Sequence, residues 1–471
     1  MSISNLFTRI LSLLSIGLVA SAILCQAQIT TTKFQLQGKV VDQHQSPITG
    51  AKITVMTKGY TTETIVITDQ TGKFLLPIES GEYTLKVSAK GFSESSQTIK
   101  IKQDNAELPN IILQIAGTNA VVMVGDTESY KAETTRSATK TSTPLRDIPQ
   151  SITVITNEQI KDQMMQSIGD IVRYTPGLSV HQGENNRDQV IIRGQNTSAD
   201  FFLNGVRDDV QYYRDLYNLE RLETLKGPNA MIFGRGGGGG VINRVTKEAQ
   251  SFPLREISIE GGSFYNRRIS ADFNQPFNDK IAFRLNSVYE NSDSFRKYVS
   301  LKRFAINPTL TFNLNKNTKA TIGYEFARDR RIADRGITSF QGRPVNIPIN
   351  TYFGNPNDSR VRSNVNILTG SIDHQFGKLN IHNRTTYGNY DRFYQNYVPG
   401  AVNTTKTLVA LTAYNNATKR KNLFSQTDLT YTIFTGQIKH TILGGIELGR
   451  QLTDNFRKTG YFNNLSTRIR R

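Results

Sequence analysis

The chain has 471 residues, with 57 Lys or Arg against 39 Asp or Glu, which gives a formal net charge of +18 at pH 7. This length exceeds that of one ordinary domain, so two or three domains are expected. Charged residues make up only 20 % of the chain and are spread along it. Spread charge is typical of a solvated or lumen surface and argues against a basic tail for nucleic acid. A basic interior can also attract an anionic ligand by focusing the electric field.

Residues 1–27 are typical of a secretory signal peptide. Arg9 supplies the positive charge, residues 10–24 are apolar, and Cys25-Gln26-Ala27 offers a small-residue cleavage site. A lipoprotein signal also has a cysteine after an apolar run, but Leu24 is too large for the position before it. Cys25 is the only cysteine, so its removal leaves no thiol, which suits an oxidising compartment. No later run of about eighteen apolar residues follows, so we expect either a soluble exported protein or a β-barrel.

Short strand-like segments separated by turn signals occupy residues 34–115. The segments are 34–41, 51–56, 65–68, 74–78 and 83–89, and their spacing predicts an all-β sandwich. The runs GKVVD, PITGAKITV, TDQTGKF and GEYTLKVSAKGF resemble the carboxypeptidase regulatory-like domain, which implies a transthyretin-like, carbohydrate-binding-like fold. That domain is an accessory one, so the resemblance implies no peptidase activity. A spacer role and a docking role remain open.

The stretch from Asn204 to Lys247 carries a turn, an aromatic and charged cluster, an alternating run and a run of glycines. Gly234, Gly236 and Gly239 satisfy GxGxxG, but a dinucleotide site needs a helix directly after this pattern. The β-branched segment 241–246 follows instead. A flexible linker or a tight turn also explains the glycines, because glycine accepts φ values that other residues avoid.

Five motifs closely resemble the plug of TonB-dependent siderophore receptors, especially those for ferric catecholates. They are DIPQS at 147–151, IRG at 192–194, and LKGP, FGRGGGGGVIN and VTK in this order between 225 and 247. The resemblance covers the chain from about residue 120 to its end. It implies an α+β plug domain over 141–250. Residues that fix the plug backbone are then Arg193, Gly194, Gly205, Gly227, Pro228, Gly234 and Gly236.

The segment 120–146 precedes the plug and contains a short apolar strand within polar sequence. Such a strand suits β-augmentation, in which an extended peptide adds to the sheet edge of a partner. By resemblance this is the TonB box and its linker, and the residues that bind TonB are Ala120, Val121, Val122, Met123, Val124 and Gly125. A last sandwich strand followed by a linker is the alternative.

Helix start signals and a possible metal motif lie within the plug. Thr156 with Gln159, and Ser167 with Asp170, predict two short helices with capped N-termini. His181 and Glu184 match H-x-x-E, but a catalytic zinc needs a third protein ligand. The other histidines carry no matching motif, and no G-x-S-x-G serine elbow is present. The sequence therefore gives little support to an enzyme.

From Leu254 onward apolar and polar residues alternate with the period of a two-faced strand. Ile281, Phe283 and Leu285 share one face, while Arg284 and Asn286 share the other. Predicted strands are 254–261, 266–274, 281–291, 301–313, 318–328, 363–376, 379–392, 423–434 and 437–450. Except at the first hairpin, which is short, short turns alternate with the long connections 329–362 and 393–422, which is the outer-membrane barrel pattern.

These segments predict the first part of a transmembrane antiparallel β-barrel over 254–471, surrounded by outer-membrane lipid. Barrels with a plugged lumen have about 22 strands, and about nine are predicted here. An open sheet edge cannot face lipid, so we expect a C-terminally truncated sequence. The fold class is mainly β: a sandwich, an α+β plug and part of a barrel.

The resemblance implies a transporter of the Gram-negative outer membrane that binds a ferric catecholate siderophore and imports it with energy from TonB. Iron is carried by the siderophore, so no cofactor or metal ligand of the protein is expected. The predicted ligand contacts are Arg187, Tyr212, Tyr213, Arg214, Arg343 and Tyr352. Two alternatives stay open: a TonB-dependent glycan importer, and a soluble periplasmic binding or signalling module.

Overall fold

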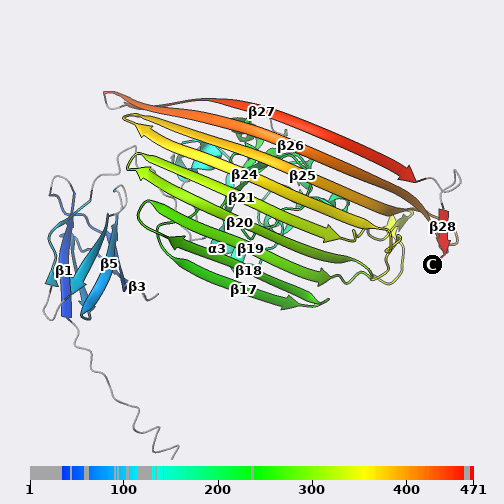
Figure 1. Cartoon of the computed structure of the whole chain (residues 1–471), viewed down its shortest axis with the longest axis horizontal. Coiled ribbons are helices and arrows are strands. Elements are labelled where there is room, and N and C mark those ends of the chain that lie inside the picture. The colour runs from blue at the N-terminus through cyan, green and yellow to red at the C-terminus, as the bar shows by residue number, and fades with distance from the viewer. Residues whose placement is uncertain are drawn as a thin grey trace, which may run out of the picture. The chain divides into compact units, whose positions relative to one another are not determined.

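The computed structural model describes residues 34–42, 45–57, 63–89, 92, 95–101, 106–113, 130, 132, 135–141, 143–234, 238–436, 438–460 and 467–470. The chain divides into two compact units, Met1–Val121 and Val122–Arg471, and strands dominate both (Figure 1). Within the described ranges, none of the helices has the length and apolar character required to span a membrane. The predicted signal peptide lies outside the described residues.

The first unit is a β-sandwich, as predicted. Its strands are β1 (Phe34–Val41), β2 (Lys52–Thr57), β3 (Glu63–Ile67), β4 (Lys73–Ile78), β5 (Gly81–Ser88), β6 (Ser95–Ile101), β7 (Ala106–Glu107) and β8 (Ile111–Ile112). One sheet has the order β4-β1-β7 with β8 on β1, and the other has the order β3-β2-β5-β6. Leu36, Ile53 and Leu85 are fully buried in a core to which both sheets contribute. The sequence prediction missed β6 to β8, two of which have only two residues.

The plug opens the second unit. Its strands are β9 (Ile152–Thr156), β10 (Leu178–Val180), β11 (Val190–Ile192), β12 (Gln195–Thr197), β13 (Phe201–Leu203), β14 (Val206–Arg207), β15 (Leu219–Lys226) and β16 (Gly240–Thr246). Its helices are α2 (Arg136–Thr139), α3 (Asn157–Asp162) and α4 (Ile168–Val172), with 3-10 turns η1 (Leu145–Asp147), η2 (Gly183–Asn185) and η3 (Gly227–Phe233). A five-stranded sheet of order β14-β13-β16-β15-β9 forms its centre.

Both predicted helix caps form. The Thr156 side chain accepts a hydrogen bond from the Gln159 backbone N–H, and Ser167 with Asp170 makes a complete capping box. Each cap satisfies backbone donors that a helix start otherwise leaves open. α3 ends at Asp162, and Met164 two residues later has a positive φ of 50°, which is incompatible with a right-handed helix.

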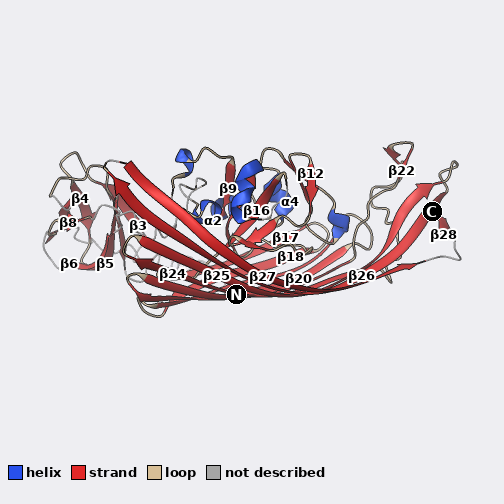
Figure 2. Ribbon diagram, turned by 90° about the horizontal axis from the view of Figure 1, so that it is seen from above, coloured by secondary structure: helices blue, strands red, loops and turns tan. Residues whose placement is uncertain are grey.

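A ten-stranded antiparallel sheet completes the second unit. Its strands are β17 (Leu254–Gly262), β18 (Asn266–Pro276), β19 (Ile281–Asp293), β20 (Ser300–Asn315), β21 (Thr318–Arg331), β24 (Arg360–Phe376), β25 (Leu379–Val402), β26 (Leu408–Thr435), β27 (Ile438–Gly460) and β28 (Thr467–Arg470). Neighbours along the chain pair in order from β17 to β27. The plug lies on the concave face of this curved sheet (Figure 2).

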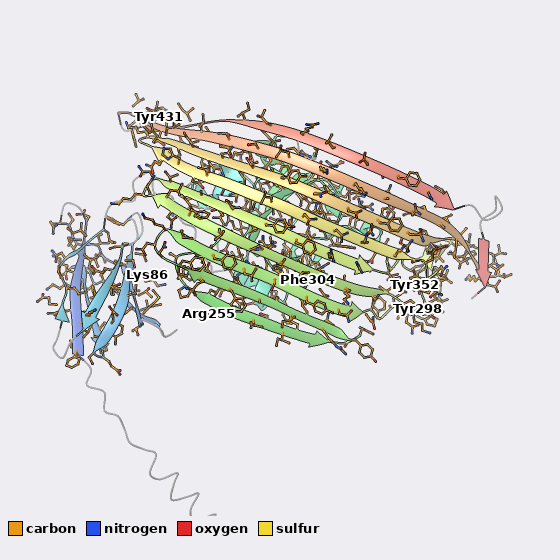
Figure 3. The ribbon with its side chains drawn as sticks, in the orientation of Figure 1. Lys86, Arg255, Tyr298, Phe304, Tyr352 and Tyr431 are labelled. Atoms are coloured by element: carbon orange, nitrogen blue, oxygen red, sulfur yellow. The ribbon has the colours of Figure 1, made fainter. Side chains whose placement is uncertain are left out.

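The two faces of the sheet differ as the alternation predicts. Arg284 and Asn286 on β19 are buried against the plug, whereas Tyr289 on the opposite face is 39 % exposed. Phe304 and Tyr431 also lie on the outer face, at 41 % and 42 % exposure (Figure 3). A polar face inward and an apolar face outward is the arrangement of a strand between a hydrated lumen and lipid.

One predicted connection is wrong. The predicted loop 393–422 is a hairpin in which β25 and β26 pair almost to the tip at 403–407. Pro399 lies where the register shifts between Pro399 and Val402, a place where sheets tolerate proline. β26 has 28 residues, roughly 90 Å at about 3.3 Å per residue. A strand needs only about 9–11 residues to cross a bilayer, so β26 is far longer than a bilayer requires.

The other long connection is confirmed. It joins β21 to β24 and contains only the short hairpin of β22 (Ser339–Phe340) and β23 (Arg343–Pro344). We call this segment, residues 332–359, the long loop. It lies at the same end of the sheet as the β25–β26 tip, whereas the β18–β19, β20–β21, β24–β25 and β26–β27 turns lie at the opposite end. Long connections are the extracellular ones in outer-membrane barrels, so we call this end the outer end.

Candidate functional site

The plug presents a strained turn toward the outer end of the sheet. Gly183, Glu184 and Asn185 have φ values of 61°, 53° and 53° in succession. Left-handed backbone is unfavourable for non-glycine residues and persists only where surrounding contacts hold it. The long loop supplies such contacts: Gln182 Nε2 donates to the Asp334 carbonyl at 3.1 Å, and Asp334 N–H donates to Asn185 Oδ1 at 3.2 Å. We call residues 181–189 the apex loop.

A carboxylate lies among guanidinium groups at this turn. Glu184 Oε2 is 2.9 Å from Arg187 Nη1 and 3.9 Å from Arg335 Nη1 of the long loop. Burial raises the pKa of the Glu184 carboxyl, but the hydrogen bond and charge of Arg187 and the charge of Arg335 outweigh burial and hold it below its ordinary value. Glu184 is therefore ionised at neutral pH, and its negative charge partly offsets the positive charges of Arg187 and Arg335.

Two strands of the sheet complete the surroundings with arginine and tyrosine. The Tyr394 ring on β25 and the Tyr414 ring on β26 meet edge to face, with centroids 5.6 Å apart. The Arg392 guanidinium lies 5.7 Å from the Tyr394 centroid, and that of Arg457 lies 4.6 Å from the Tyr414 centroid. Tyr414 also interacts with the Glu184 carboxylate. Arginine and tyrosine are the residue types that most often dominate binding surfaces.

Several N–H donors of these residues have no acceptor. Within the described part of the chain, the buried nitrogens without a hydrogen-bond partner around the apex loop are Asn186 Nδ2, Arg187 Nε, Arg335 Nε, Arg392 Nη2 and Asn396 Nδ2. A buried polar group left unpaired costs about 1–3 kcal/mol. Because all of these atoms are donors, a ligand rich in anionic oxygens would satisfy them. We call Glu184, Arg187, Arg335, Arg392, Tyr394, Tyr414 and Arg457 the apex cluster.

Below the apex loop, a plug arginine is held in a closed polar cage. Arg214 is 2 % exposed, with its guanidinium 4.3 Å from the Phe201 ring centroid and 4.2 Å from that of Tyr212. Its Nε donates to Asp208 Oδ2 at 2.9 Å, and Arg244 Nη2 donates to the same oxygen at 2.8 Å. Burial raises the pKa of the Asp208 carboxyl, but the two guanidinium charges outweigh burial and hold it below its ordinary value.

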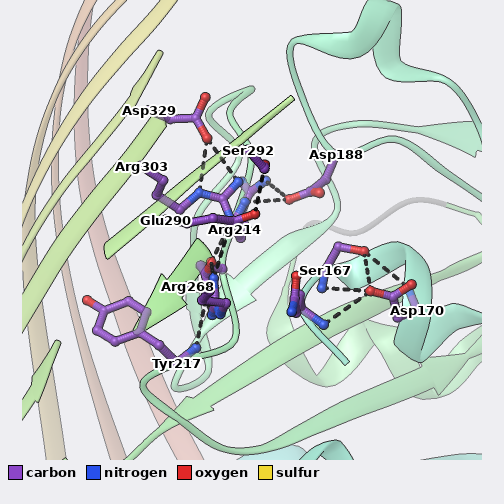
Figure 4. A network of polar contacts seen from close by, with 12 residues as sticks. Ser167, Asp170, Asp188, Arg214, Tyr217, Arg268, Glu290, Ser292, Arg303 and Asp329 are labelled. Atoms are coloured by element: carbon purple, nitrogen blue, oxygen red, sulfur yellow. Dashed lines mark hydrogen bonds and ion pairs between the residues drawn. The ribbon is translucent and has the colours of Figure 1, made fainter. Parts of the chain in front are cut away.

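Ion pairs join the plug to the sheet (Figure 4). Asp215 of the plug accepts from Arg268 of β18 at 2.7 and 2.9 Å and from Arg303 of β20 at 2.5 Å. Arg303 Nη2 also contacts Asp329 of β21 at 2.9 Å. Burial raises the pKa of the Asp215 carboxyl, but the charges of the two arginines outweigh burial and lower it strongly. The plug is thus held on the sheet by buried charge pairs.

Hydrogen bonds connect the plug to the segment that precedes it in the chain. Glu223 on β15 is fully buried, and its carboxylate accepts from the Thr135 hydroxyl and, at 2.5 Å, from the Ser137 hydroxyl. Asn243 Nδ2 donates to the other Glu223 oxygen at 2.7 Å. We call residues 135–141 the entry segment. The predicted TonB box, Ala120 to Gly125, lies outside the described residues.

Comparisons with known proteins match both units. A family model described as TonB-dependent Receptor Plug Domain matches residues 144–241, and one described as Carboxypeptidase regulatory-like domain matches residues 35–114. The probable TonB-dependent siderophore receptor PiuA of Acinetobacter baumannii is 27 % identical over 349 residues, which are 71 % of this chain and 46 % of that protein. The catecholate siderophore receptor Fiu of Escherichia coli K12 is 27 % identical over 378 residues, which are 73 % of this chain and 49 % of that protein.

The chain contains a TonB-dependent receptor plug domain. Its location is accordingly the Gram-negative outer membrane, and its family is one of transporters and receptors. The crystal structure of the siderophore receptor PiuA from A. baumannii superposes with a TM-score of 0.67 at 26 % identity, over 72 % of this chain and 52 % of that one. The receptor chain spans about half the length of the relatives it matches.

The predicted ligand contacts of this receptor lie in different surroundings in the structure. Arg187 lies in the apex cluster. Tyr213 is partly buried with the Arg331 guanidinium 3.9 Å from its ring centroid, and burial raises its pKa to about 12 against the opposing charge of Arg331. Tyr352 packs edge to face on Tyr298 with centroids 6.0 Å apart (Figure 3), and Arg343 is exposed on β23.

Two predicted contacts are buried, Arg214 in the polar cage of the plug and Tyr212 between the plug and the sheet, where its ring centroid lies 5.9 Å from that of Tyr390 on β25. Tyr212 is 3 % exposed and Arg214 is 2 % exposed. The Tyr212 hydroxyl donates to Asp208 at 2.9 Å, and the Arg214 donors are used within the cage. In this arrangement a ligand at the apex loop reaches neither side chain. The sequence predicted them as ligand contacts, and it carried no signal of their burial.

Sequence reasoning missed most of the apex cluster. Tyr394 and Tyr414 fall in the segment 393–422 that was predicted as a loop, although alternate residues of β25 from Arg392 to Tyr394 and beyond share one face of the strand. Arg335 comes from the long loop, and Arg457 from the outer end of β27, where the prediction ended its last strand at residue 450. Only the period-two pattern beyond residue 392 was available as a signal in the sequence.

The predicted backbone positions can be placed in part. Positive φ values occur at Arg193, Gly194, Gly205, Gly227 and Gly234. At Gly227, which has φ of 71°, a Cβ atom would lie 2.5 Å from Arg193 Nη1, so both conformation and space favour glycine. Gly236 and the side chain of Pro228 lie outside the described part. Their roles remain predictions.

The residues of the H-x-x-E motif have other partners. His181 Nδ1 accepts from the Gly183 N–H at 3.4 Å, and Glu184 pairs with Arg187. Among the described residues, no group of three or more His, Cys, Asp or Glu side chains is placed to hold a metal ion.

Proposed function

We propose that this receptor binds a ferric siderophore of the catecholate type at the apex cluster and imports it across the outer membrane with energy transmitted by TonB. The observation that carries the proposal is the set of unpaired N–H donors around the apex loop, next to four arginines of the apex cluster. A ferric catecholate complex carries several anionic oxygens, and charge-assisted hydrogen bonds from arginine are the strong kind.

The names of the relatives support the substrate class. PiuA is named a siderophore receptor and Fiu a catecholate siderophore receptor. The tyrosine pair beside the arginines offers aromatic faces to catechol rings, which stack favourably on aromatic side chains. Iron enters as part of the substrate, and we propose no cofactor and no catalytic chemistry for the chain. Arg343 and Tyr352 remain proposed contacts for parts of the ligand beyond the apex cluster.

The energy source is proposed from the family and from the order of the chain. The predicted TonB box precedes the entry segment, which is fastened to Glu223 in the central plug sheet. A strand captured by TonB at residues 120–125 would therefore pull first on a buried anchor of the plug. Deleting residues 120–125 should leave ligand binding unchanged and abolish energised uptake. Unchanged uptake would remove this assignment.

A glycan importer is the second candidate. A carboxypeptidase regulatory-like domain precedes the plug here, and such a domain also occurs ahead of glycan-importing plugs. Sugars are usually bound by stacked aromatics with neutral hydrogen-bonding groups. The apex cluster instead combines its tyrosines with four arginines, which favours an anionic ligand.

The test measures binding to the receptor expressed from its native gene. Ferric tris-catecholate, ferric tris-hydroxamate and a neutral oligosaccharide are titrated at two salt concentrations. We expect preferential binding of the catecholate complex, weakened by salt. Arg392→Gln should lower its affinity about 10- to 100-fold, since hydrogen bonds to charged groups contribute about 1.5–3 kcal/mol.

Arg362→Gln is the matched control. Arg362 belongs to the neighbouring strand β24, is exposed on the outer face and pairs with Asp391 at 3.3 Å. Its loss removes the same charge from the same region without touching the apex cluster. Equal loss of affinity in both variants would point to a general charge effect. Binding of the oligosaccharide alone would overturn the substrate class.

A further inference from the structure

Glu184 is placed where an anionic ligand would have to bind. Its carboxylate contacts Arg187 at 2.9 Å and Arg335 at 3.9 Å, and it interacts with Tyr414. A carboxylate among binding arginines has two possible effects on an anionic ligand. It can hold the arginines in position and so assist binding, or it can compete with the ligand for the same donors.

The N–H donors of Arg187 and Arg335 distinguish the two effects. Arg187 and Arg335 both keep an unpaired Nε–H, although Glu184 contacts an Nη of each. A guanidinium group offers five N–H donors in a fixed fork. A single carboxylate therefore accepts hydrogen bonds from only some of these donors, and a ligand with more oxygens can accept from more of them. The contacts of Glu184 are replaceable.

The backbone of the apex loop also favours displacement. Glu184 and Asn185 have φ values of 53°, and Gly183 has 61°. Non-glycine residues held in this region tend to relax when the contacts that hold them are removed. The Glu184 side chain and the Asp334 backbone supply such contacts, and Arg335 Nη1 donates to the Glu184 backbone carbonyl at 3.2 Å. Loss of the Glu184 contacts would allow the carboxylate to swing away from the arginines.

We propose that Glu184 is an internal competitor for the anionic ligand: its carboxylate engages Arg187 and Arg335 in the empty receptor and is displaced when ligand oxygens bind. This role rests on the proposed function and deepens it. The carboxylate then makes binding depend on the negative charge of the ligand. Ligands with one negative charge gain little from the exchange, whereas polyanionic complexes satisfy more donors than Glu184 does.

The test compares Glu184→Gln with the native receptor. Gln keeps the size and one carbonyl oxygen but removes the competing charge. We expect the affinity for ferric tris-catecholate to rise about tenfold, which corresponds to about 1.4 kcal/mol, and to become more sensitive to salt because the net positive charge of the site increases. The affinity for an uncharged ferric tris-hydroxamate should change much less.

Asp391→Asn is the matched charge control. Asp391 precedes Arg392 on β25, but it lies partly exposed on the opposite face and pairs with Arg362. This variant adds the same charge difference at nearly the same position along the strand, without entering the apex cluster. It should leave the catecholate affinity unchanged. An equal rise in both variants would overturn the proposal in favour of long-range attraction.

A further pair of variants guards against a folding defect. Glu184→Gly removes the carboxylate and suits the positive φ, so it should also tighten binding. Glu184→Asp keeps the charge and should bind about as weakly as the native receptor. Unchanged or weaker binding in both Glu184→Gln and Glu184→Gly would overturn competition and assign a positioning role. If the native receptor does not bind the catecholate complex, the proposed function fails, and this role fails with it.

Discussion

Arg268 of β18 and Asp215 of the plug form a two-point ion pair, with Nη2–Oδ1 at 2.7 Å and Nη1–Oδ2 at 2.9 Å. Arg303 of β20 reaches the same carboxylate at 2.5 Å, and Glu290 of β19 accepts from Arg268 at 2.9 Å. All four side chains are nearly inaccessible to solvent. A charge in such a network is costly to remove, because its partners stay buried without compensation.

Asp215→Asn should therefore loosen the plug on the sheet. Arg268 and Arg303 would lose their shared partner, at a cost of about 3–5 kcal/mol. Because Glu290 and Asp329 still pair with these arginines, we expect a cost at the lower end of this range. Hydrogen exchange of the β15 and β16 amides measures the free energy of opening. Protection in these strands should fall while that of β6 in the first unit stays unchanged.

The pair between Lys161 and Glu256 serves as the control for this prediction. It also joins plug to sheet, at 2.5 Å, but its side chains are 42 % and 31 % exposed, against 4 % for both Arg268 and Asp215. Exposed pairs contribute about 0–1 kcal/mol, so Glu256→Gln should have little effect. Similar losses in Glu256→Gln and Asp215→Asn would show that burial does not decide the strength of plug docking.

Asp208 gives the plug a defined response to acid. Its carboxylate accepts from Arg214 at 2.9 Å and Arg244 at 2.8 Å, and its folded-state pKa lies below the ordinary 3.8. The stabilisation is therefore fully present above the unfolded pKa of about 3.9 and is lost as the pH falls through the lower folded pKa. Plug stability, followed by hydrogen exchange at β13 and β16, should be level from about pH 7 to 5 and decline below about pH 4.

Asp208→Asn should flatten that decline, because the titrating group is gone. Asp188 acts in the opposite direction: burial outweighs the charge of Arg214 and raises its pKa above 3.8, so protonation of Asp188 favours the folded plug. Asp188→Asn should therefore steepen the decline. An unchanged acid response in Asp208→Asn would mean that other carboxylates control it.

The local features of the fold were the ones that the sequence predicted. Thr156 and Ser167 cap their helices with partners three residues away, and the alternation around Arg284 separates two faces within one strand. Each depends on neighbours along the chain, so periodicity and spacing suffice. Resemblance added the plug, whose glycine-rich run has no period that would predict a fold.

The apex cluster depends on partners far apart in the chain. Tyr394 meets Tyr414 because β25 pairs with β26 in a register that sets Tyr394 opposite Asn416, and Arg335 arrives through the long loop. No local pattern gives that register or that loop path. Arg214 shows the same dependence on distant partners: arginine is rarely buried, and its full set of plug partners was visible only in three dimensions.

Glu223 should control how firmly the entry segment is held. It is fully buried and accepts from Thr135, Ser137 and Asn243. Hydrogen bonds to a charged group contribute about 1.5–3 kcal/mol, so Thr135→Val should expose the entry segment more often. Faster hydrogen exchange at residues 135–141 and new protease cleavage there would confirm this. Thr197→Val, in the three-stranded plug sheet, is the control and should leave the entry segment protected.

Arg296 should hold the long loop over the apex loop. Its Nε donates to Asp334 Oδ2 at 2.8 Å, and its Nη1 donates to the backbone carbonyls of Ile349 and Thr351. Asp334 in turn contacts Asn185 of the apex loop, and its neighbour Arg335 contacts Glu184. One arginine thus joins both ends of the long loop and fixes a member of the apex cluster from a distance.

Arg296→Gln should therefore raise hydrogen exchange across residues 332–352 and lower ligand affinity about tenfold or more, mainly through faster dissociation. Arg296→Lys keeps the charge toward Asp334 but lacks the planar fork that reaches two carbonyls as well, so it should restore only part of the affinity. Full restoration by lysine would show that charge alone holds the long loop. Unchanged exchange in Arg296→Gln would show that the contacts of Thr338 and Phe340 with the β25–β26 tip are sufficient.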